Sequence, residues 1–403
     1  MESVDMIGPP WFESAMVMKL MTVLFGGIPD PRVDRTRRYP LINIIVIAVL
    51  AVMCGAERWE EIEVWAKEWK PWLSTFLRFG RHAIPSHHMF RRVLGLLDPE
   101  AFNRCFIEWT QRIEADTQGK VVAVDGKTSC GSFKHSDKTG ALHLVSAWLT
   151  ENKLVLGQVA TREKSNEITA IPELLRLLEL AGATVTIDAM GCQKKIVAEI
   201  VAKGANYVIA VKDNQPTLCE EIETAFVTAE IADEPVPPEF VFETTEKGHG
   251  RTETRRVKVL DVEDRISVTS EWVGLQSIVM LESQRTCKGE TTSEIRYYIS
   301  SLVPNAALIA QCIREHWGIE NGLHWRLDVG FIEDDSRIRT GNASANFSML
   351  RRIALNFMLA DRDSKDSLSM RRFKAGLGPA HLERILLAAA KAMAIPPSPH
   401  ASA

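Results

Sequence analysis

Residues 183–211, ATVTIDAMGCQKKIVAEIVAKGANYVIAV, decide the fold class of this chain. The outer parts, 183–188 and 206–211, are short apolar runs rich in β-branched residues, which is typical of buried strands. The segment between them, 192–203, has the spacing of an amphipathic helix. Strand, helix and strand in this order predict two parallel strands joined by a right-handed crossover. We therefore expect a mixed α/β fold.

The sequence before this unit extends the predicted sheet. Residues 121–125, VVAVD, form a short strand, and residues 142–149 and 153–160 have the pattern of an antiparallel hairpin. An amphipathic helix with a Ser-Asn cap at 165–166 follows the hairpin. The order strand, hairpin, helix, strand, helix, strand predicts a five-stranded mixed sheet with flanking helices, in which three antiparallel strands are extended by two parallel ones.

Two of these predicted strands end on aspartates, Asp125 and Asp188. If the two strands lie side by side, both carboxylates emerge at the edge of the sheet where α/β proteins place their ligands. Adjacent carboxylates repel each other unless a proton or a cation joins them, and hard oxygen ligands favour Mg²⁺ or Mn²⁺. The alternative is that both aspartates are structural caps, and their positions alone leave the two interpretations open.

A third acid lies in residues 315–337, EHWGIENGLHWRLDVGFIEDDSR. Spacings of three and four residues place His316, Glu320 and His324 on one face of a helix. Glu320 could join the two aspartates, or the three residues could form a zinc site of their own. Two histidines eight residues apart on one helix are farther from a shared ion than the i, i+4 pair of zinc proteases, which favours the first interpretation.

Composition limits the class of protein. A chain of 403 residues exceeds what one hydrophobic core covers, so we expect about two or three domains. The seven cysteines are scattered, which indicates a reduced, cytoplasmic protein rather than a disulfide scaffold or a zinc ribbon. The apolar run 41–56 is shorter than the roughly 20 residues that cross a bilayer, so we expect a buried helix and no membrane association.

Basic residues gather in two places, although the net charge of −4 gives no overall attraction to nucleic acid. One is an acid-free segment, 78–97, in a predicted all-helical region that ends near residue 115. The other surrounds a glycine-punctuated turn at 247–251. Each is equally consistent with a solvated face or with a surface that grips phosphates. The arginines concerned are Arg91, Arg92, Arg251, Arg255 and Arg256.

The last half of the chain begins with a β-rich segment. Residues 229–240 are acidic and proline-rich, which is typical of a linker, and residues 240–300 alternate as strands do. We expect the helix that carries Glu320 to begin at Pro304. A last helix at 381–394 precedes a tail of disordered composition.

Six phrases, in this order, are similar to one known family: VDGK, EKSNEITAIPELL, TIDAMGCQ, VKDNQP, GHGR with TETRR, and HWGIENGLHWRLDV-F-EDDSR. They resemble the H-repeat-associated, ISAs-type transposases of bacterial insertion sequences, within the larger DDE transposase group. The resemblance covers residues 15–395. It implies an RNase H-like core in which Asp125, Asp188 and Glu320 form an acidic triad.

The resemblance also implies how the chain is divided. The expected segments are an all-helical, transposase-associated, DNA-binding domain at 1–117, the first part of the catalytic core at 118–225, a β-rich insertion before the glutamate helix at 226–300, the rest of the core with the C-terminal helices at 301–395, and a disordered tail at 396–403.

The implied activity is DNA transposition. The three carboxylates would hold two Mg²⁺ ions, with Mn²⁺ able to substitute, for cutting phosphodiester bonds at terminal inverted repeats and joining the 3′ ends to target DNA. The implied partner is double-stranded DNA, bound by a homo-oligomer at the nucleoid. Further DNA contacts are expected from Lys127, His316, Arg314 and Arg326. The alternative is a catalytically inactive or domesticated protein, derived from a transposase, that only binds DNA.

The glutamate helix departs from some related DDE groups at three positions. Those groups have a tyrosine, an arginine and a lysine where this chain has Ile313, His316 and Leu327. The resemblance therefore leaves open how the flanking DNA strand is handled, including whether a hairpin intermediate forms.

Overall fold

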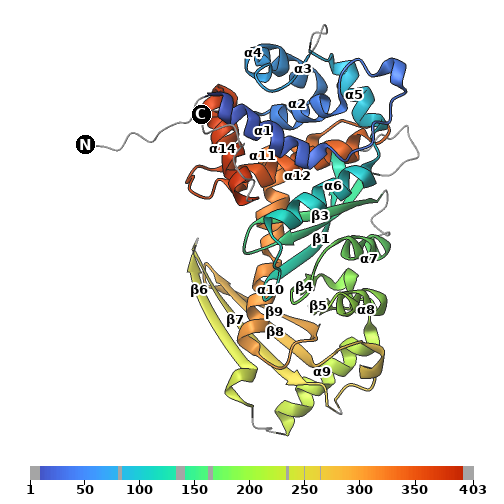
Figure 1. The fold of residues 1–403 in the computed structure, drawn as a ribbon. Helices are drawn as coiled ribbons and strands as arrows, with labels where there is room; N and C mark the ends of the chain where they lie inside the picture. Colours follow the sequence, from blue (N-terminus) through green and yellow to red (C-terminus); the bar gives the residue numbers. More distant parts are fainter. Residues whose placement is uncertain are drawn as a thin grey trace.

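The computed structural model describes residues 10–79, 84–132, 141–161, 167–232, 236–248, 250–263 and 265–393. The predicted cap at 165–166, the centre of the turn at 247–251 and the tail at 396–403 lie outside these ranges. Helices from both ends of the chain gather at one end of an elongated molecule, and the β-rich insertion forms the other end (Figure 1).

A nine-stranded sheet runs through the molecule in the order β3-β2-β1-β4-β5-β9-β8-β7-β6. In its first half, β1 pairs antiparallel with β2 and parallel with β4, while β4 pairs parallel with β5. This confirms the predicted five-stranded mixed sheet of an RNase H-like fold. These strands are β1 (Val121–Ser129), β2 (Leu142–Leu149), β3 (Leu154–Thr161), β4 (Thr184–Ile187) and β5 (Asn206–Val211).

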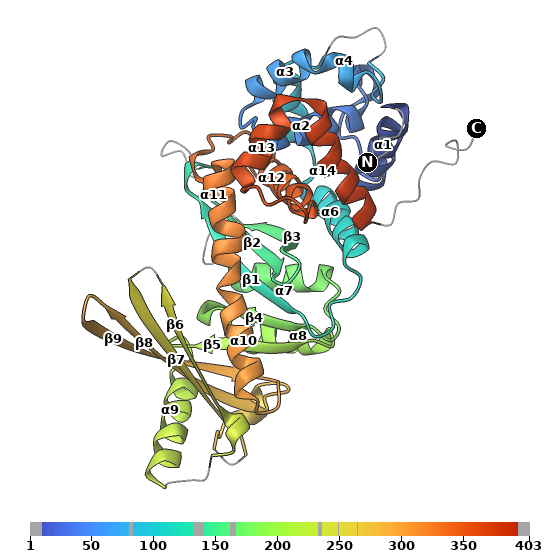
Figure 2. The same cartoon turned by 90° about the vertical axis from the view of Figure 1, so that its left-hand side faces the viewer.

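The insertion continues this sheet instead of forming a separate one. Its last strand pairs antiparallel with β5, so that Val208 lies opposite Ser300. The outer ends of the insertion strands project from the body as an arm (Figure 2). The four strands are β6 (Val241–Gly248), β7 (Arg251–Asp261), β8 (Ser277–Cys287) and β9 (Glu290–Ser300).

A helix that the sequence did not predict, α9 (Pro216–Ile231), leads into the insertion. Pro216 stands in its first turn, where a proline costs no hydrogen bond. Leu218, Ile222 and Phe226 recur at four-residue spacing and are buried. The linker predicted at 229–240 therefore starts inside a helix, because the apolar stripe of α9 outweighs the acidic composition around it.

Helices cover both faces of the sheet. On one face, α7 (Glu167–Leu177) and α8 (Lys194–Ala202) share an apolar core with β1 to β5. On the other face, α10 (Ala306–His316) packs on Val121, Val208 and Val257. The helix that leads to Glu320 is thus held directly against the strands that carry the two aspartates.

The N-terminal and C-terminal helices share one apolar core. Its centre is α2, in which every residue except Ile42 is buried, as predicted from the apolar run at 41–56. Leu50 in α2 and Phe347 in α12 are both fully buried in this core. Segment 1–117 therefore does not have a core of its own. The helices are α1 (Pro10–Phe25), α2 (Leu41–Met53), α3 (Trp59–Glu68), α4 (Lys70–Leu73), α5 (His87–Leu96), α6 (Pro99–Ile113), α11 (Trp325–Phe331), α12 (Ala343–Ala360), α13 (Leu368–Leu377) and α14 (Pro379–Ala392).

Within the described ranges, no helix has both the length and the apolar character that crossing a membrane requires.

Candidate functional site

Asp125 and Asp188 are neighbours in the central sheet. β1 and β4 are parallel neighbours with Val124 opposite Ile187, so Asp125 and Asp188 come next on the two adjoining strands. Asp188 directly follows β4, but the strand predicted to end at Asp125 continues to Ser129, because Asp125 and the residues after it pair with β2. Asp125 Oδ1 accepts a hydrogen bond from its neighbour Gly126 N–H at 2.8 Å. The sequence predicted that these two carboxylates lie close together if their strands are parallel neighbours, and the structure has that pairing.

Asp188 also has the structural role that its position allowed. It stands before a short 3₁₀ turn, Ala189–Gly191, and its Oδ1 accepts from the N–H groups of Met190 at 3.1 Å and Gly191 at 3.3 Å. Its Oδ1 orients the carboxylate by capping this turn. The two interpretations of Asp188 are therefore compatible.

The two carboxylates interact as like charges. Enclosure by neighbouring atoms raises the pKa of Asp188, and the negative charge of Asp125 raises it further. Burial alone would raise the pKa of Asp125, but His324 and His316 lower it below its usual range. A pair in which one carboxylate is ionised and destabilises the charge of the other is suited to a cation.

Glu320 lies where the helix widens. After α10 ends at His316, residues Glu320–His324 form one π-helical turn that leads directly into α11. Such turns are rare and are frequently found at functional sites. The predicted start at Pro304 is close to the observed one, because the Asn305 side chain caps α10 by accepting from Leu308 N–H at 3.0 Å. The Glu320 side chain is exposed.

The two histidines of this stretch have different partners. His324 is buried, and its Nε2 lies 3.2 Å from Asp125 Oδ2. His316 Nδ1 lies 3.0 Å from Thr186 Oγ1 on β4. Because each imidazole is engaged with a different strand, the arrangement does not resemble a single zinc site shared by both.

His316 lies within electrostatic reach of all three predicted acids. Burial lowers its pKa, and the charges of Asp125, Asp188 and Glu320 each act in the opposite direction without overcoming this effect. The charges of all three predicted acids therefore act on this one imidazole.

The donor set fits hard divalent cations in its chemistry. Asp125, Asp188 and Glu320 offer oxygen ligands, which Mg²⁺ and Mn²⁺ prefer. In the part of the chain that the structure describes, however, no three His, Cys, Asp or Glu side chains are grouped closely enough to hold an ion. Glu320 is exposed, as Asp188 is, so its side chain is free to change rotamer.

A buried contact between a histidine and a glutamate, next to Gly126, had no signal in the sequence. His143 on β2 and Glu167 at the start of α7 form this pair, and both side chains are almost fully buried. Thr128 Oγ1 lies 2.8 Å from His143 Nδ1, which fixes the ring on the neighbouring strand. Strand alternation and helix capping patterns do not reveal that residues from these two elements meet.

This pair explains the glycine that follows Asp125. A Cβ atom at Gly126 would collide with Glu167 Oε1 and His143 Nε2. We expect Gly126→Ala to lower the free energy of unfolding by about 1–3 kcal/mol, as overpacking of a core does. Gly248→Ala is the control, because an added Cβ there meets nothing within 4 Å. Chemical denaturation of both variants measures the effect, and equal midpoints would contradict the steric argument.

Lys127 is engaged with acids. Its Nζ lies 2.8 Å from Asp328 and 3.1 Å from Asp334. Burial lowers the pKa of Lys127, but these two carboxylates raise it above its usual value. Its charge therefore holds β1 against α11 and against the 3₁₀ turn that follows α11.

The arginines of the arm are paired with glutamates. Arg255 lies 2.8 Å from Glu253 and 3.2 Å from Glu246, and Arg314 on α10 lies 2.9 Å from the same Glu246. The remaining predicted arginines of the arm make longer contacts: Arg251 with Glu253 at 3.9 Å and Arg256 with Glu243 at 4.0 Å.

Arg326 on α11 is half-buried. Burial lowers its pKa, and the nearby charge of Arg371 lowers it further.

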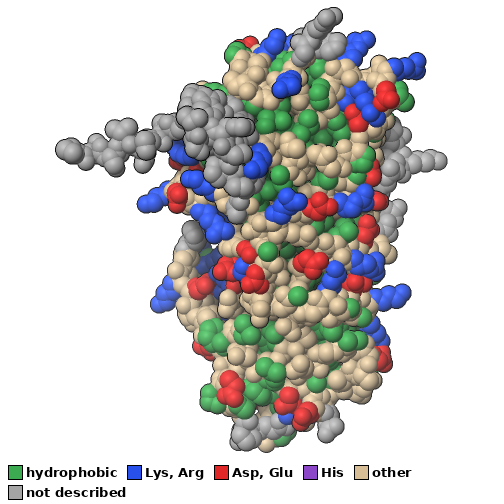
Figure 3. All heavy atoms as spheres, viewed as in Figure 1, with side chains coloured by type: hydrophobic (Ala, Val, Ile, Leu, Met, Phe, Trp, Pro, Cys, Tyr) green, Lys and Arg blue, Asp and Glu red, His purple; other side chains and the backbone are tan. Residues whose placement is uncertain are grey.

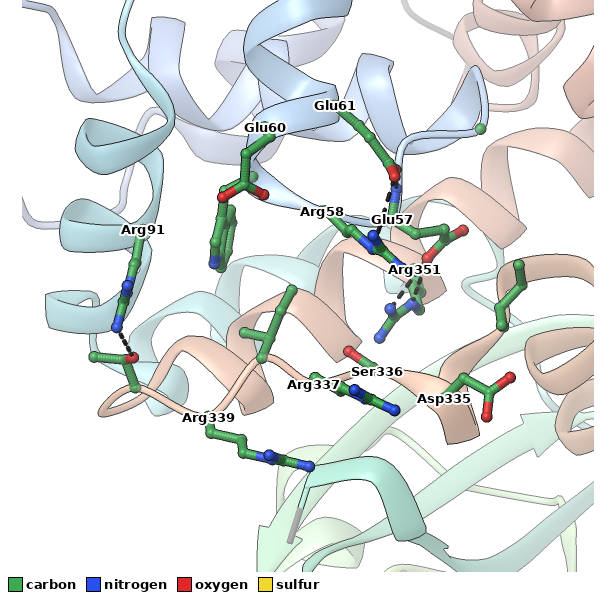
Figure 4. A pocket seen from close by; sticks show the side chains of 15 residues that line it. Glu57, Arg58, Glu60, Glu61, Arg91, Asp335, Ser336, Arg337, Arg339 and Arg351 are labelled. Atoms are coloured by element: carbon green, nitrogen blue, oxygen red, sulfur yellow. Dashed lines mark hydrogen bonds and ion pairs between the residues drawn. The ribbon is translucent and has the colours of Figure 1, made fainter. Parts of the chain in front are cut away.

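Arg91 lines a cleft of about 890 Å³ between the N-terminal helices and the segment after α11. Its Nη2 donates to Thr340 Oγ1 at 3.0 Å, and Arg337 and Arg339 stand on the opposite side (Figure 4). Arg92, on the same helix, is exposed. Figure 3 shows Lys and Arg side chains interspersed with acidic ones on one face of the molecule.

Residues 116–357 match the family described as Transposase DDE domain, and residues 23–110 match the family described as DDE_Tnp_1-associated. The chain belongs to the DDE transposase family. This membership makes the chain a transposase and confirms the resemblance seen in its six sequence phrases.

Curated relatives agree with this assignment. The chain is 40% identical over 376 residues to the H repeat-associated putative transposase YhhI of Escherichia coli K12, covering 92% of this chain and 98% of that protein. It is 42% identical over 363 residues to the putative transposase YncI of Escherichia coli O157:H7, covering 89% of this chain and 92% of that protein.

Among solved structures, the piggyBac transposase synaptic complex with hairpin DNA aligns with 99% of this chain and 77% of its own, at 10% identity and a TM-score of 0.38.

Proposed function

We propose that this transposase cuts phosphodiester bonds at the terminal inverted repeats of a bacterial insertion sequence and joins the 3′ ends to target DNA. The observation that carries the proposal is the placement of the three acids: Asp125 on β1, Asp188 directly after its parallel neighbour β4, and Glu320 on the π-helical turn that follows α10, the helix packed on both strands.

Asp125, Asp188 and Glu320 would hold two Mg²⁺ ions, for which Mn²⁺ could substitute. When bound, such ions activate a water or a 3′-hydroxyl and stabilise the charge on the leaving oxygen and the phosphoryl group. No serine or tyrosine nucleophile is required, because the attacking oxygen comes from water or DNA.

The neighbouring side chains hold these acids in place. His324 Nε2 contacts Asp125 Oδ2, while Asp125 Oδ1 accepts from the N–H of Gly126. The Asp188 carboxylate is oriented by the 3₁₀ turn that it caps. Glu320 would then turn toward the two aspartates, and the π-helical turn gives its backbone a position that a regular α-helix would not.

Double-stranded DNA is the proposed partner, bound by a homo-oligomer in the nucleoid. The phosphate contacts are assigned to the exposed arginines, Arg91 and Arg92 on α5 and Arg251 and Arg256 on the arm. We propose that the functional segments are 1–117, 118–225, 226–300, 301–395 and 396–403. The helices of the first segment and those of the fourth act as one packed unit, because they share an apolar core.

The test is cutting of a labelled duplex that carries the inverted repeats flanking the gene. We expect nicked product with Mg²⁺ or Mn²⁺ and none when EDTA removes the metal. Cutting that EDTA leaves intact would contradict the metal assignment. Binding without cutting in either metal would favour the alternative, an inactive transposase-derived protein that only binds DNA.

A further inference from the structure

We propose that the groove between α10 and the outer half of the insertion strands takes a single DNA strand, and that Glu246 occupies the position of one of its phosphates until DNA arrives. This inference rests on the proposed function and goes beyond it, because it assigns a path for the strand and a residue that must be displaced.

The groove has a volume of about 780 Å³. The inward faces of β6 to β9 form one wall and α10 forms the other, an arrangement that Figure 2 shows from the side of the arm. Trp317 and Asn321, which lie on either side of Glu320 in the sequence, also line the groove. A strand lying along it would therefore reach the proposed catalytic acids.

Four arginines line this groove: Arg251, Arg255, Arg296 and Arg314. The Glu246 carboxylate lies between two of them, 3.2 Å from Arg255 Nη1 on β7 and 2.9 Å from Arg314 Nη2 on α10. An anionic group held by two guanidinium groups from different elements is the geometry with which proteins bind phosphate.

This carboxylate is held weakly. The side chain of Glu246 is 52% exposed and that of Arg314 is 55% exposed. Ion pairs between such exposed side chains contribute little to stability. Arg255 is only 20% exposed and has a second partner, Glu253, at 2.8 Å. Its guanidinium would therefore stay in place when Glu246 leaves, ready to accept a phosphate oxygen.

The shape of the groove favours a strand over a small anion. Apolar side chains, including Phe242, Val257 and Leu308, lie between the arginines and leave room for sugar and base. Grooves that bind single strands combine cationic groups along the backbone with such surfaces. A single phosphate would fill only the site between Arg255 and Arg314.

The experiment compares Glu246→Gln with Glu243→Gln. Glu243 lies on the same strand, is 54% exposed and contacts Arg256 on the opposite face of the arm, so it matches the charge and exposure of Glu246. Fluorescence anisotropy measures binding of a labelled single-stranded repeat end and of the same sequence as a duplex. We expect Glu246→Gln to bind the single strand about two- to fivefold more tightly than Glu243→Gln does.

A second pair of variants tests the arginine. Arg314→Gln should weaken binding of the single strand and reduce the slope of log K against log salt by about 0.7. Arg104→Gln on α6 is the control, because Arg104 is 54% exposed and paired with a glutamate as Arg314 is, but does not line the groove, so it should leave the slope unchanged. Thermal unfolding checks that all four variants fold, since each alters an exposed side chain.

The inference is overturned if Glu246→Gln and Glu243→Gln bind the single strand equally, or if the gain occurs only with the duplex. These outcomes leave the proposed function intact when wild-type protein still binds and cuts repeat DNA. Wild-type protein that neither binds nor cuts would overturn both.

Discussion

Asp188→Asn should reduce strand cutting by about a thousand-fold or more, because losing a metal-binding carboxylate removes several kcal/mol of transition-state stabilisation. The substitution tests chemistry rather than folding. An asparagine oxygen can still accept from the N–H groups of Met190 and Gly191, so the turn that Asp188 caps is kept. We therefore expect unchanged DNA binding and a melting temperature no lower than that of the wild type, because the substitution also removes the repulsion from Asp125.

The matched control is Asp363→Asn, which makes the same change at an exposed aspartate between α12 and α13. Cutting of the inverted-repeat duplex is measured for both variants under the same Mg²⁺ concentration. Equal activity in the two variants would remove Asp188 from the catalytic triad.

Glu320→Gln extends this test to the glutamate helix. Its side chain is exposed, so the variant should fold normally and lose cutting as severely as Asp188→Asn does. If Asp188→Asn loses activity and Glu320→Gln keeps it, the third acid lies elsewhere. Glu167 would be the next candidate, since its charge contributes to the raised pKa of Asp188.

The sequence predicted the positions of Asp125 and Asp188 because their placement depends on local patterns. Short β-branched runs, each ending on an acid, followed the strand and crossover rules, and β1 and β4 are indeed parallel neighbours. The burial of α2 was likewise predictable, since an apolar run with no polar face has no other stable environment in water.

The sequence did not predict features that depend on contacts between distant segments. The buried pair of His143 and Glu167 joins a strand to a helix terminus, and neither residue departs from the pattern of its own element. The widened turn that begins at Glu320 depends on packing around it, because a single inserted residue hardly changes helical periodicity. The continuation of the sheet from β5 into the insertion depends on a pairing between Val208 and Ser300, which are far apart in the chain.

A buried ion pair fixes the segment after the glutamate helix to α12. Arg352 Nη1 donates to Glu333 Oε1 at 2.8 Å, and the two side chains are 0% and 1% exposed. Ser348 Oγ donates to the same oxygen at 2.7 Å. Arg352→Met should lower the free energy of unfolding by about 3–5 kcal/mol, because it leaves the Glu333 charge buried without its partner.

This pair also predicts how stability depends on pH. Burial alone would raise the pKa of Glu333, but Arg352, Arg351 and Ser348 hold it below its usual range. A glutamate in the unfolded chain has a pKa of about 4.3, which is higher than that of Glu333 in the folded protein. As the pH falls, the unfolded state therefore takes up the proton before the folded state does. The stabilisation is complete above that pKa and is lost as the pH falls through the lower pKa of the folded state. As the pH is lowered from 7 to 3, the denaturation midpoint of Glu333→Gln should fall less steeply than that of the wild type.

A double-mutant cycle separates the pair from its surroundings. Arg352→Met combined with Glu333→Gln should be less destabilised than Arg352→Met alone, because the second change removes the unpaired charge. Arg314→Gln breaks an exposed pair and should stay within about 0.5 kcal/mol of the wild type in the same urea titration. If Arg352→Met lowers the free energy of unfolding no more than Arg314→Gln does, the Glu333 carboxyl group must be protonated or hydrated in the folded variant. In that case the segment after Glu320 is held to α12 by apolar packing instead of by the ion pair.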